Sequence, residues 1–354
     1  MLPIRFVAGP SDVGDRPVVM VDGSFGSAPR GGLHLAHWPR NRTPDELRRD
    51  LSTEVAFAFL DLDAERRAAL AEGCVALALN HYDTDGVCAL FALSRPEAAL
   101  RHRELLNAVA AAGDFFEVRD DRAYAVDVAL QDLGRRWKGD RDGLLSEALD
   151  LLGRMLEDPA AEEERWSDAL ERLEQDRRSL EGALFDDLVY LDLGVWSATL
   201  QGDGPAPTDE PTFDPGRHAF LGSGRHDRAL LLGSGPAGTT ARLVLGTRSF
   251  FDVVSRPPSG RPDLAALAAC LNEAEGPRDD GHRWHHQPQD GATPELWFGQ
   301  EPLRLYAEHA GRALGWSRID PLEIKRHVLD AIRDAWVLPD DDDEAEGGED
   351  IFDV

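Results

Sequence analysis

The sequence predicts an α/β protein, with a mostly parallel sheet covered by helices on both faces and a smaller α+β domain after it. Three observations predict this class. Short apolar runs at residues 17–22 and 74–79 each end at a polar loop, helical spacing follows each run, and a stretch rich in Pro and Gly at 201–216 precedes a second set of strand and helix patterns. The 354 residues suffice for two domains of ordinary size.

The composition divides the chain into four expected parts. These are an α/β domain at 1–200 that carries the loop 81–85, a linker at 201–216, an α+β domain at 217–338, and a disordered tail at 339–354. The tail prediction depends on charge, since nine acidic residues follow Pro339. Like charges repel each other, and so few apolar residues cannot form a core.

The first elements follow from short local patterns. Residues 17–22 form an apolar run that ends before a glycine, as a strand does. Thr43 stands before Pro44 and three residues before Glu46, which predicts the N-cap of a helix. Apolar residues at four-residue spacing extend this helix to about residue 61, and a second helical stretch starts at Ala64.

The next segment predicts a buried strand that leads into a polar loop. Residues 74–79 are apolar at every position, which is typical of a strand covered on both faces. The loop 80–86 follows, then an apolar helix at 87–93 and another helix at 101–112. In open α/β sheets, ligands bind at loops that follow the carboxyl ends of strands.

The rest of the chain carries weaker patterns. We expect a helix at 162–184, strands at 229–232 and 241–245, and helices at 263–272 and 321–338. Gly, Pro and Asp around residues 282–286 predict an exposed loop there. No Gly-x-Ser-x-Gly elbow is present, so a hydrolase with a serine triad is not indicated.

The charge and cysteine content exclude several classes of protein. The formal net charge is −28, which repels phosphate backbones, so duplex nucleic acid and anionic membranes are not expected as partners. The three cysteines form no Cys-x-x-Cys pair, and no apolar stretch reaches the length of a membrane span. We therefore expect a cytoplasmic protein in a reducing compartment; the sequence leaves its oligomeric state open.

The loop at 81–86 carries the residues most typical of a chemical site. His81, Asp83 and Asp85 alternate along the chain, so in an extended segment their side chains would point the same way. Imidazole and carboxylate groups together suit a divalent metal, and the oxygen majority favours Mn²⁺, with Mg²⁺ as the alternative. Gly86 would permit a backbone turn. The simpler interpretation is a turn whose aspartates cap the following helix.

Residues 74–93 resemble the first motif of the DHH phosphoesterase superfamily, in which a strand, an H-x-D-x-D-G loop and an apolar helix follow one another. The resemblance implies that His81 and Asp83 bind one metal ion and Asp85 a second, and that the pair activates a water for attack on a phosphodiester or a phosphoanhydride. It also implies a further aspartate and an Asp-His-His triplet. This chain has no such triplet, and its adjacent histidines are His285 and His286.

A second resemblance covers the whole first half, from the His-Trp-Pro segment at 37–39 through His81 to Gly113-Asp114-Phe115. This half is similar to an uncharacterised family of bacterial proteins. The similarity implies no activity.

Further ligands would have to come from other segments. Asp114, at the end of a predicted helix, is the first choice, and His37 is the second. Arg40 and Arg42 precede a predicted helix and would bind phosphate oxygens, and Arg248 of the second domain would close over the substrate. The alternatives are a packed histidine, a turn aspartate and solvated arginines.

These features predict a metal-dependent hydrolase that acts on a small phosphorylated substrate or a short oligonucleotide. The alternative is a non-catalytic binding or regulatory protein that keeps a degenerate metal loop. A further carboxylate or histidine within about 5 Å of the Asp83 and Asp85 carboxylates would favour the enzyme, because a catalytic centre needs more ligands than one loop supplies.

Overall fold

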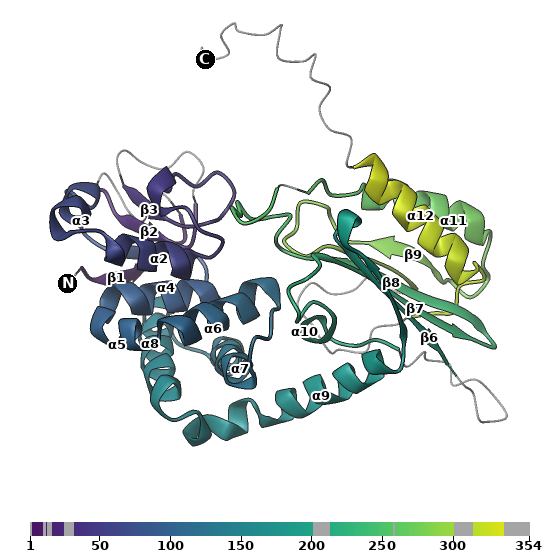
Figure 1. The fold of residues 1–354 in the computed structure, drawn as a ribbon, viewed down its shortest axis with the longest axis horizontal. Coiled ribbons are helices and arrows are strands. Elements are labelled where there is room, and N and C mark those ends of the chain that lie inside the picture. The colour runs from purple at the N-terminus through teal and green to yellow at the C-terminus, as the bar shows by residue number, and fades with distance from the viewer. Residues whose placement is uncertain are drawn as a thin grey trace, which may run out of the picture.

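The computed structural model describes residues 2–9, 12, 16–24, 32–200, 213–257, 259–300 and 314–335. The chain forms a mixed α/β structure with two separate sheets, which lie on opposite sides of the molecule in Figure 1. Most of the predicted linker at 201–216 and all of the predicted tail at 339–354 lie outside the described residues.

The first sheet has four strands, all paired in parallel, in the order β1-β4-β2-β3. The strands are short: β1 (Ile4–Phe6), β2 (Val19–Val21), β3 (Leu33–Leu35) and β4 (Leu77–Leu79). The last three are buried at every position, as expected for a parallel sheet covered on both faces, and this holds for the edge strand β3 as well as for the central strands β2 and β4. Their parallel pairing brings the carboxyl ends of β2, β3 and β4 to one edge.

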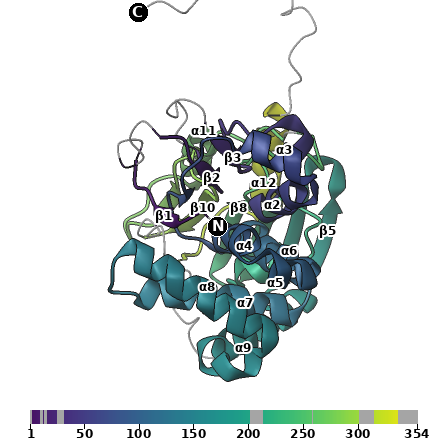
Figure 2. The same ribbon diagram turned by 90° about the vertical axis from the view of Figure 1, so that its left-hand side faces the viewer.

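Helices surround this sheet, with α4 (Thr84–Ser94) at the centre of the packing. It contacts α2 (Ser52–Asp61), α6 (Arg103–Phe115) and α8 (Arg141–Glu157), and Figure 2 shows it in the middle of the helical layer. The other elements of this half are η1 (Asp45–Leu47), α3 (Ala64–Leu70), α5 (Pro96–Arg101) and α7 (Asp121–Arg136). Because α4 is buried along nearly its whole length, its first turn is held rigidly.

The helix predicted to start at Thr43 begins later than expected. Residues 45–47 form only a 3₁₀ turn, and α2 starts at Ser52. The Thr43 hydroxyl donates to the carbonyl of Ala36 at 2.7 Å instead of capping a helix. The N-terminus of α2 is capped by Asp85, from a distant part of the chain.

The second sheet has six strands in the order β5-β6-β7-β8-β10-β9. They are β5 (Leu184–Leu188), β6 (Leu193–Thr199), β7 (Arg228–Gly235), β8 (Gly238–Leu245), β9 (Arg283–His286) and β10 (Glu295–Gly299). Only β6 and β7 pair in parallel, so this sheet is mixed. Helices α11 (Leu264–Glu275) and α12 (Pro321–Asp334) share an apolar core with it.

Several segments of this half differ from the sequence predictions. The predicted helix at 162–184 is a 3₁₀ segment, η2 (Pro159–Arg165), followed by α9 (Ser167–Glu181). Strands β5 and β6 belong to the second sheet although they precede residue 200, because β6 pairs with β7. The predicted exposed loop at 282–286 contains β9, whose Trp284 and His285 are buried against β10.

Helices α9 and α10 (Arg217–Phe220) are among the elements that join the halves. Helix α9 runs along the lower edge of the molecule from the first half to the second (Figure 1). The short helix α10 places the His218 ring against α6, where Nε2 lies 3.0 Å from the carbonyl oxygen of Ala112. Within the described residues, no helix is both long and apolar enough to cross a bilayer.

Candidate metal centre

Acidic and histidine side chains gather where three parallel strands end. Asp22 directly follows β2, His37 lies two residues after β3, and Asp83 lies four residues after β4. The backbone N–H of Asp22 donates to the Leu35 carbonyl of β3 at 3.0 Å, which ties the first two loops together. This is the edge at which open α/β sheets bind ligands.

The donor atoms fall into two groups that share one residue. Asp22, His37, Asp85 and Asp114 form the first, here called the buried group; Asp22, His81 and Asp83 form the second, here called the outer group. Within each group the donor atoms lie within 4.8 Å of one another. The two groups therefore have the composition and the spacing of cation sites.

Asp22 faces both groups through different oxygens. Its Oδ1 lies 3.6 Å from His37 Nε2, and its Oδ2 lies 3.3 Å from His81 Nε2. The Ser52 hydroxyl donates to Oδ1 at 2.6 Å and fixes the carboxylate. The residue has a left-handed backbone, with φ of 46°, which turns the chain sharply at the end of β2.

His37 is held so that one ring nitrogen faces the carboxylates. Its Nδ1 lies 2.5 Å from the carbonyl oxygen of Asp50, and because a carbonyl only accepts, Nδ1 carries the proton. The other ring nitrogen, Nε2, is the atom available as a metal ligand. It lies 3.0 Å from Asp114 Oδ2 and 3.7 Å from Asp85 Oδ2. Such a fixed tautomer is typical of histidines that bind metals.

Asp85 and Asp114 reach the buried group from two helices. Asp85 lies in the first turn of α4 and accepts hydrogen bonds from the backbone N–H groups of Ser52 and Thr53 at 2.7 and 2.8 Å. The N-terminus of α2 therefore points at the carboxylate and stabilises its charge. Asp114 lies in the last turn of α6, where Gly113 allows close packing, since a Cβ there would lie 2.7 Å from Thr84 Cβ.

The outer group is built on the N-terminus of α4. Asp83 is the N-cap of this helix and accepts from the Gly86 N–H at 2.8 Å. Its other oxygen lies 2.6 Å from His81 Nε2, and His81 Nδ1 lies 2.8 Å from Asn80 Oδ1. Because the amide oxygen of Asn80 accepts a hydrogen bond from the Nδ1–H group, Nε2 is oriented toward the two carboxylates.

The structure corrects the predicted geometry of the loop. Residues 81–85 are not one extended segment, because α4 begins at Thr84, and helical geometry separates Asp85 from Asp83. Asp83 is a cap, as the simpler interpretation had it, and also a member of the outer group. Gly86 serves close approach and not a turn, since an added Cβ would lie 3.0 Å from both Asp22 Oδ2 and Asp83 Oδ1.

Burial, together with the charges of neighbouring carboxylates, raises the pKa values of the carboxyl groups in the buried group. Burial raises the pKa of Asp22 to about 8, with a further rise from the charge of Asp83. Burial also raises the pKa of Asp114 well above its usual range, and it raises that of Asp85. Shifts of this kind are common in functional sites. Without a cation, these carboxyl groups therefore favour their protonated forms more than exposed ones do.

In the outer group, an ion pair dominates the titration. Burial lowers the pKa of His81, but the charge of Asp83 and the hydrogen bond with Asp22 outweigh burial and raise it well above its usual value. Burial would raise the pKa of Asp83, but the charge of His81 holds it at about 2.

The donor set fits divalent cations. Asp22 Oδ2, His37 Nε2 and Asp114 Oδ2 are buried, and among the described residues none of them makes a hydrogen bond of good geometry. His81 Nε2 lies 3.3 Å from Asp22 Oδ2, and His37 Nε2 lies 3.0 Å from Asp114 Oδ2. Poorly satisfied buried polar atoms are costly, and a bound ion would satisfy all three at one place. With three carboxylates and one imidazole in the buried group, the donors suit Mn²⁺ or Mg²⁺ better than a thiolate-preferring metal.

The three predicted substrate arginines lie in different environments. Arg40 is exposed on the loop after His37, and Arg42 is exposed with Nη2 3.5 Å from His34 Nε2. Arg248 is buried; its guanidinium forms an ion pair with Glu117 and lies 4.4 Å over the Phe115 ring. Burial lowers the pKa of Arg248 to about 9, and the charge of Arg256 adds to this.

Asp22 is the member of the centre that sequence reasoning missed. It ends an apolar run and precedes a glycine, which is the same pattern of strand, acid and glycine that marks the loop after β4. The predicted ligands His37 and Asp114 do lie with Asp85, so the structure brings all five predicted metal residues to one edge.

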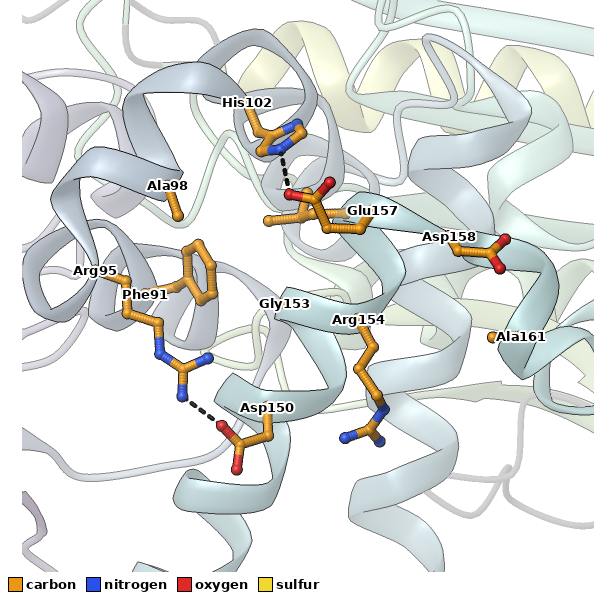
Figure 3. Close-up of a pocket in the computed structure, with 11 residues that line it drawn as sticks. Phe91, Arg95, Ala98, His102, Asp150, Gly153, Arg154, Glu157, Asp158 and Ala161 are labelled. Carbon is orange, nitrogen blue, oxygen red and sulfur yellow. Dashed lines mark hydrogen bonds and ion pairs between the residues drawn. The ribbon is translucent and has the colours of Figure 1, made fainter.

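A separate pocket of about 720 Å³ lies at the other end of α4, between α4, α5 and α8. Figure 3 shows its charged side chains paired with one another, Arg95 with Asp150 and His102 with Glu157. Arg154 is likewise paired, with Glu147 and Glu162. Since these charges are satisfied internally, the pocket does not indicate a charged ligand.

Comparison with known proteins places the chain in a family but assigns no activity. No curated protein matches it. Residues 3–343 match DUF6687, a family of unknown function, and this range includes both sheets and every residue of the metal centre. The chain therefore belongs to the DUF6687 family.

Proposed function

We propose that the protein is a metal-dependent hydrolase of a phosphodiester or a phosphoanhydride. The observation that carries the proposal is the shared carboxylate: Asp22 directs one oxygen toward His37 and the other toward His81, so two groups of donors adjoin each other. This division also follows the resemblance of residues 74–93 to DHH phosphoesterases, which assigns His81 and Asp83 to one metal ion and Asp85 to another.

The residues present would hold two divalent cations, Mn²⁺ or Mg²⁺. His37, Asp85 and Asp114 would hold one, His81 and Asp83 the other, and Asp22 would bind both. Such cations supply a bound water of lowered pKa and offset the charge of phosphate oxygens. The remaining roles belong to the protein: the Asp50 carbonyl binds His37 Nδ1 and so directs Nε2 toward the carboxylates, and the first turn of α2 stabilises the charged form of Asp85.

The outer group is more exposed to solvent than the buried group, and we expect the phosphate of the substrate to bind on that side. The side chains of His81 and Asp83 are each 28% exposed, whereas those of Asp22 and His37 are fully buried. Trp38, which is partly exposed, lies edge-on to the His81 ring with centroids 4.6 Å apart. Arg40 and Arg42, on the same loop, remain the predicted contacts to phosphate oxygens, and a small phosphorylated molecule or a short oligonucleotide remains the predicted substrate.

Further donors near the loop favour an enzyme over a degenerate binding protein. His37 Nε2 lies 3.7 Å from the Asp85 carboxylate, and Asp22 adjoins His81 and Asp83. A loop that had lost its function would not need to retain four carboxylates and two histidines in one place, because each buried charge destabilises the fold.

The test compares the wild-type protein with Asp22→Asn and with Asp150→Asn, a matched substitution in the ion pair with Arg95. Each protein is loaded with Mn²⁺, dialysed and assayed for metal content and for hydrolysis of a generic phosphodiester and of pyrophosphate. We expect about two Mn²⁺ per wild-type chain, and a loss of metal and at least about 100-fold of activity in Asp22→Asn alone. A wild-type protein that binds Mn²⁺ without turnover would instead support the binding protein, and one that binds no Mn²⁺ would contradict both.

A further inference from the structure

The segment at residues 247–255, here called the docking segment, leaves the second sheet after β8 and reaches the metal centre in the first half. Figure 1 shows the connection after β8 extending between the two sheets. The Thr247 hydroxyl donates to the backbone carbonyl of Asp114 at 2.5 Å, and the Asp252 N–H donates to the backbone carbonyl of His37 at 2.8 Å. Both acceptors therefore belong to members of the buried group.

The docking segment also contacts the His37 ring. The Phe251 ring stacks on it, with centroids 4.0 Å apart and an angle of 14° between the planes. Phe251 is buried, so the contact excludes water from that face of the imidazole. A flat face at this distance restricts rotation of the ring about its Cβ–Cγ bond, and that rotation sets where Nε2 points.

Asp50 links the docking segment to the His37 ring, because its side chain binds the segment and its backbone carbonyl binds the imidazole. Its carboxylate accepts from the backbone N–H groups of Val254 and Ser255 at 2.8 and 2.9 Å, and from the Ser255 hydroxyl. Its carbonyl accepts a hydrogen bond from the Nδ1–H group of His37. One residue thus anchors the docking segment and selects the tautomer of His37.

We infer that Phe251 and Asp50 are positioning residues, through which the second half of the chain orients His37 for cation binding in the buried group. The inference rests on the proposed metal centre and adds a role for residues that would not touch the metal or the substrate. Residues that orient a metal ligand change metal affinity by about 10- to 100-fold when they are replaced. A role in packing alone would change stability and leave the affinity of a folded protein unaltered.

The experiment titrates the full-length, metal-free protein with Mn²⁺ and follows binding by electron paramagnetic resonance, which distinguishes isolated Mn²⁺ from a spin-coupled pair. The variants are Phe251→Leu, which keeps an apolar side chain but removes the flat ring, and Phe251→Tyr, which keeps the ring. Phe250→Leu is the matched control, because Phe250 contacts Trp38 and Phe251, and within the described residues no ring contact joins it to His37. We expect Phe251→Leu to lower the affinity of the buried group by about 10- to 100-fold and to lose the coupled signal, while the other two stay within about 3-fold of wild type.

Asp50→Asn keeps the size of the side chain but cannot accept all three hydrogen bonds, and a smaller loss of affinity in the same direction is expected. If Phe251→Leu fails to fold, the Asp50→Asn variant alone decides the inference. Wild-type affinity in a folded Phe251→Leu or Asp50→Asn variant, or an equal loss in Phe250→Leu, would overturn the inference and leave the proposed function intact. Failure of the wild-type protein to bind Mn²⁺ would overturn both.

Discussion

The buried group and the outer group use the same residue types in opposite environments. Asp22, His37 and Asp85 are inaccessible, and backbone or hydroxyl groups fix each of them. His81 and Asp83 are each 28% exposed and bind mainly to each other. A cation in the buried group would meet four preorganised donors, whereas one in the outer group would meet three and would retain open positions. The difference suggests one cation that is retained and one that exchanges and meets the substrate.

Substitution of one aspartate in each group should give the largest effects and test most directly whether the two groups differ. Asp85→Asn removes a donor from the buried group, and we expect it to lower Mn²⁺ affinity there by more than about 100-fold. Asp83→Asn should cost only the outer cation, because Asn also caps helices and should keep α4 intact. Metal content after dialysis measures both. Equal losses in the two variants would show that the groups do not differ.

Removal of metal by a chelator should separate the two groups in time. We expect the outer cation to leave at least about tenfold faster, because water and chelator reach His81 and Asp83 directly. Activity should be lost in this first phase and return on addition of Mn²⁺, while the thermal unfolding temperature should fall only in the second phase. Stopped-flow assays with a metal indicator measure the two rates, and a single phase that removes both cations would argue against distinct sites.

The pH dependence of the metal-free protein should report the buried group. The pKa of Asp22 is raised to about 8 in the folded chain, against about 3.9 for an exposed aspartate. Between these values the folded state retains a proton that the unfolded state has lost, so the free energy of unfolding falls as pH rises, by about 1.4 kcal/mol per unit of pKa difference at most. His81 acts in the same direction, since its pKa in the folded chain is raised above 6.5. Its contribution to stability is lost as pH rises from about 6.5 through this higher, folded-state pKa.

We therefore expect the melting temperature of metal-free protein to fall by several degrees from about pH 5 to about pH 8. Added Mn²⁺ should raise it most at the higher pH, where fewer protons compete with the cation for the carboxylates. Calorimetry with and without Mn²⁺ measures both trends. A melting temperature that rises over this interval without metal would contradict the pKa shifts.

Gly86→Ala should have the smallest effect and should act on the outer group. The added methyl would lie 2.8 Å from Leu79 Cδ1 and 3.0 Å from Asp22 Oδ2 and Asp83 Oδ1. Such overpacking costs about 1–3 kcal/mol, and we expect a displaced Asp83 with weaker outer binding. Retention of the buried cation is the internal control. Gly153→Ala on α8 is the matched variant, because its nearest neighbour is the flexible end of Arg95 at 3.2 Å.

Local patterns predicted β2 and β4 of the four-stranded first sheet, but not β1 or β3, and part of the centre. The apolar runs that became β2 and β4 and the loop that carries His81, Asp83 and Asp85 follow from residue type and spacing alone. Asp22 shows the same signal in a weaker form, an acid between a strand and a glycine, without a histidine beside it. The mixed character of the second sheet was not predictable, because the parallel pairing of β6 with β7 joins segments about 30 residues apart.

Other errors had a nonlocal cause. The sequence places a helix start at Thr43 because its neighbours form a good capping pattern, but the carboxylate of Asp85 caps Ser52 across the fold. His37 and Asp114 were predicted as ligands, but their orientation was not, because it depends on contacts of Asp50 and Gly113 that follow from how α2 and α6 pack. No periodicity within a single segment carries that information.

The single carboxylate between the two groups makes their occupancies interdependent. The pKa of Asp22 is raised to about 8, so the first ion to bind must displace a proton from this carboxylate. The second ion then binds without competition from that proton. Linkage requires the benefit to be reciprocal: the second ion strengthens the hold on the first by the same factor. Binding of Mn²⁺ should then be more strongly cooperative below neutral pH than in alkaline buffer.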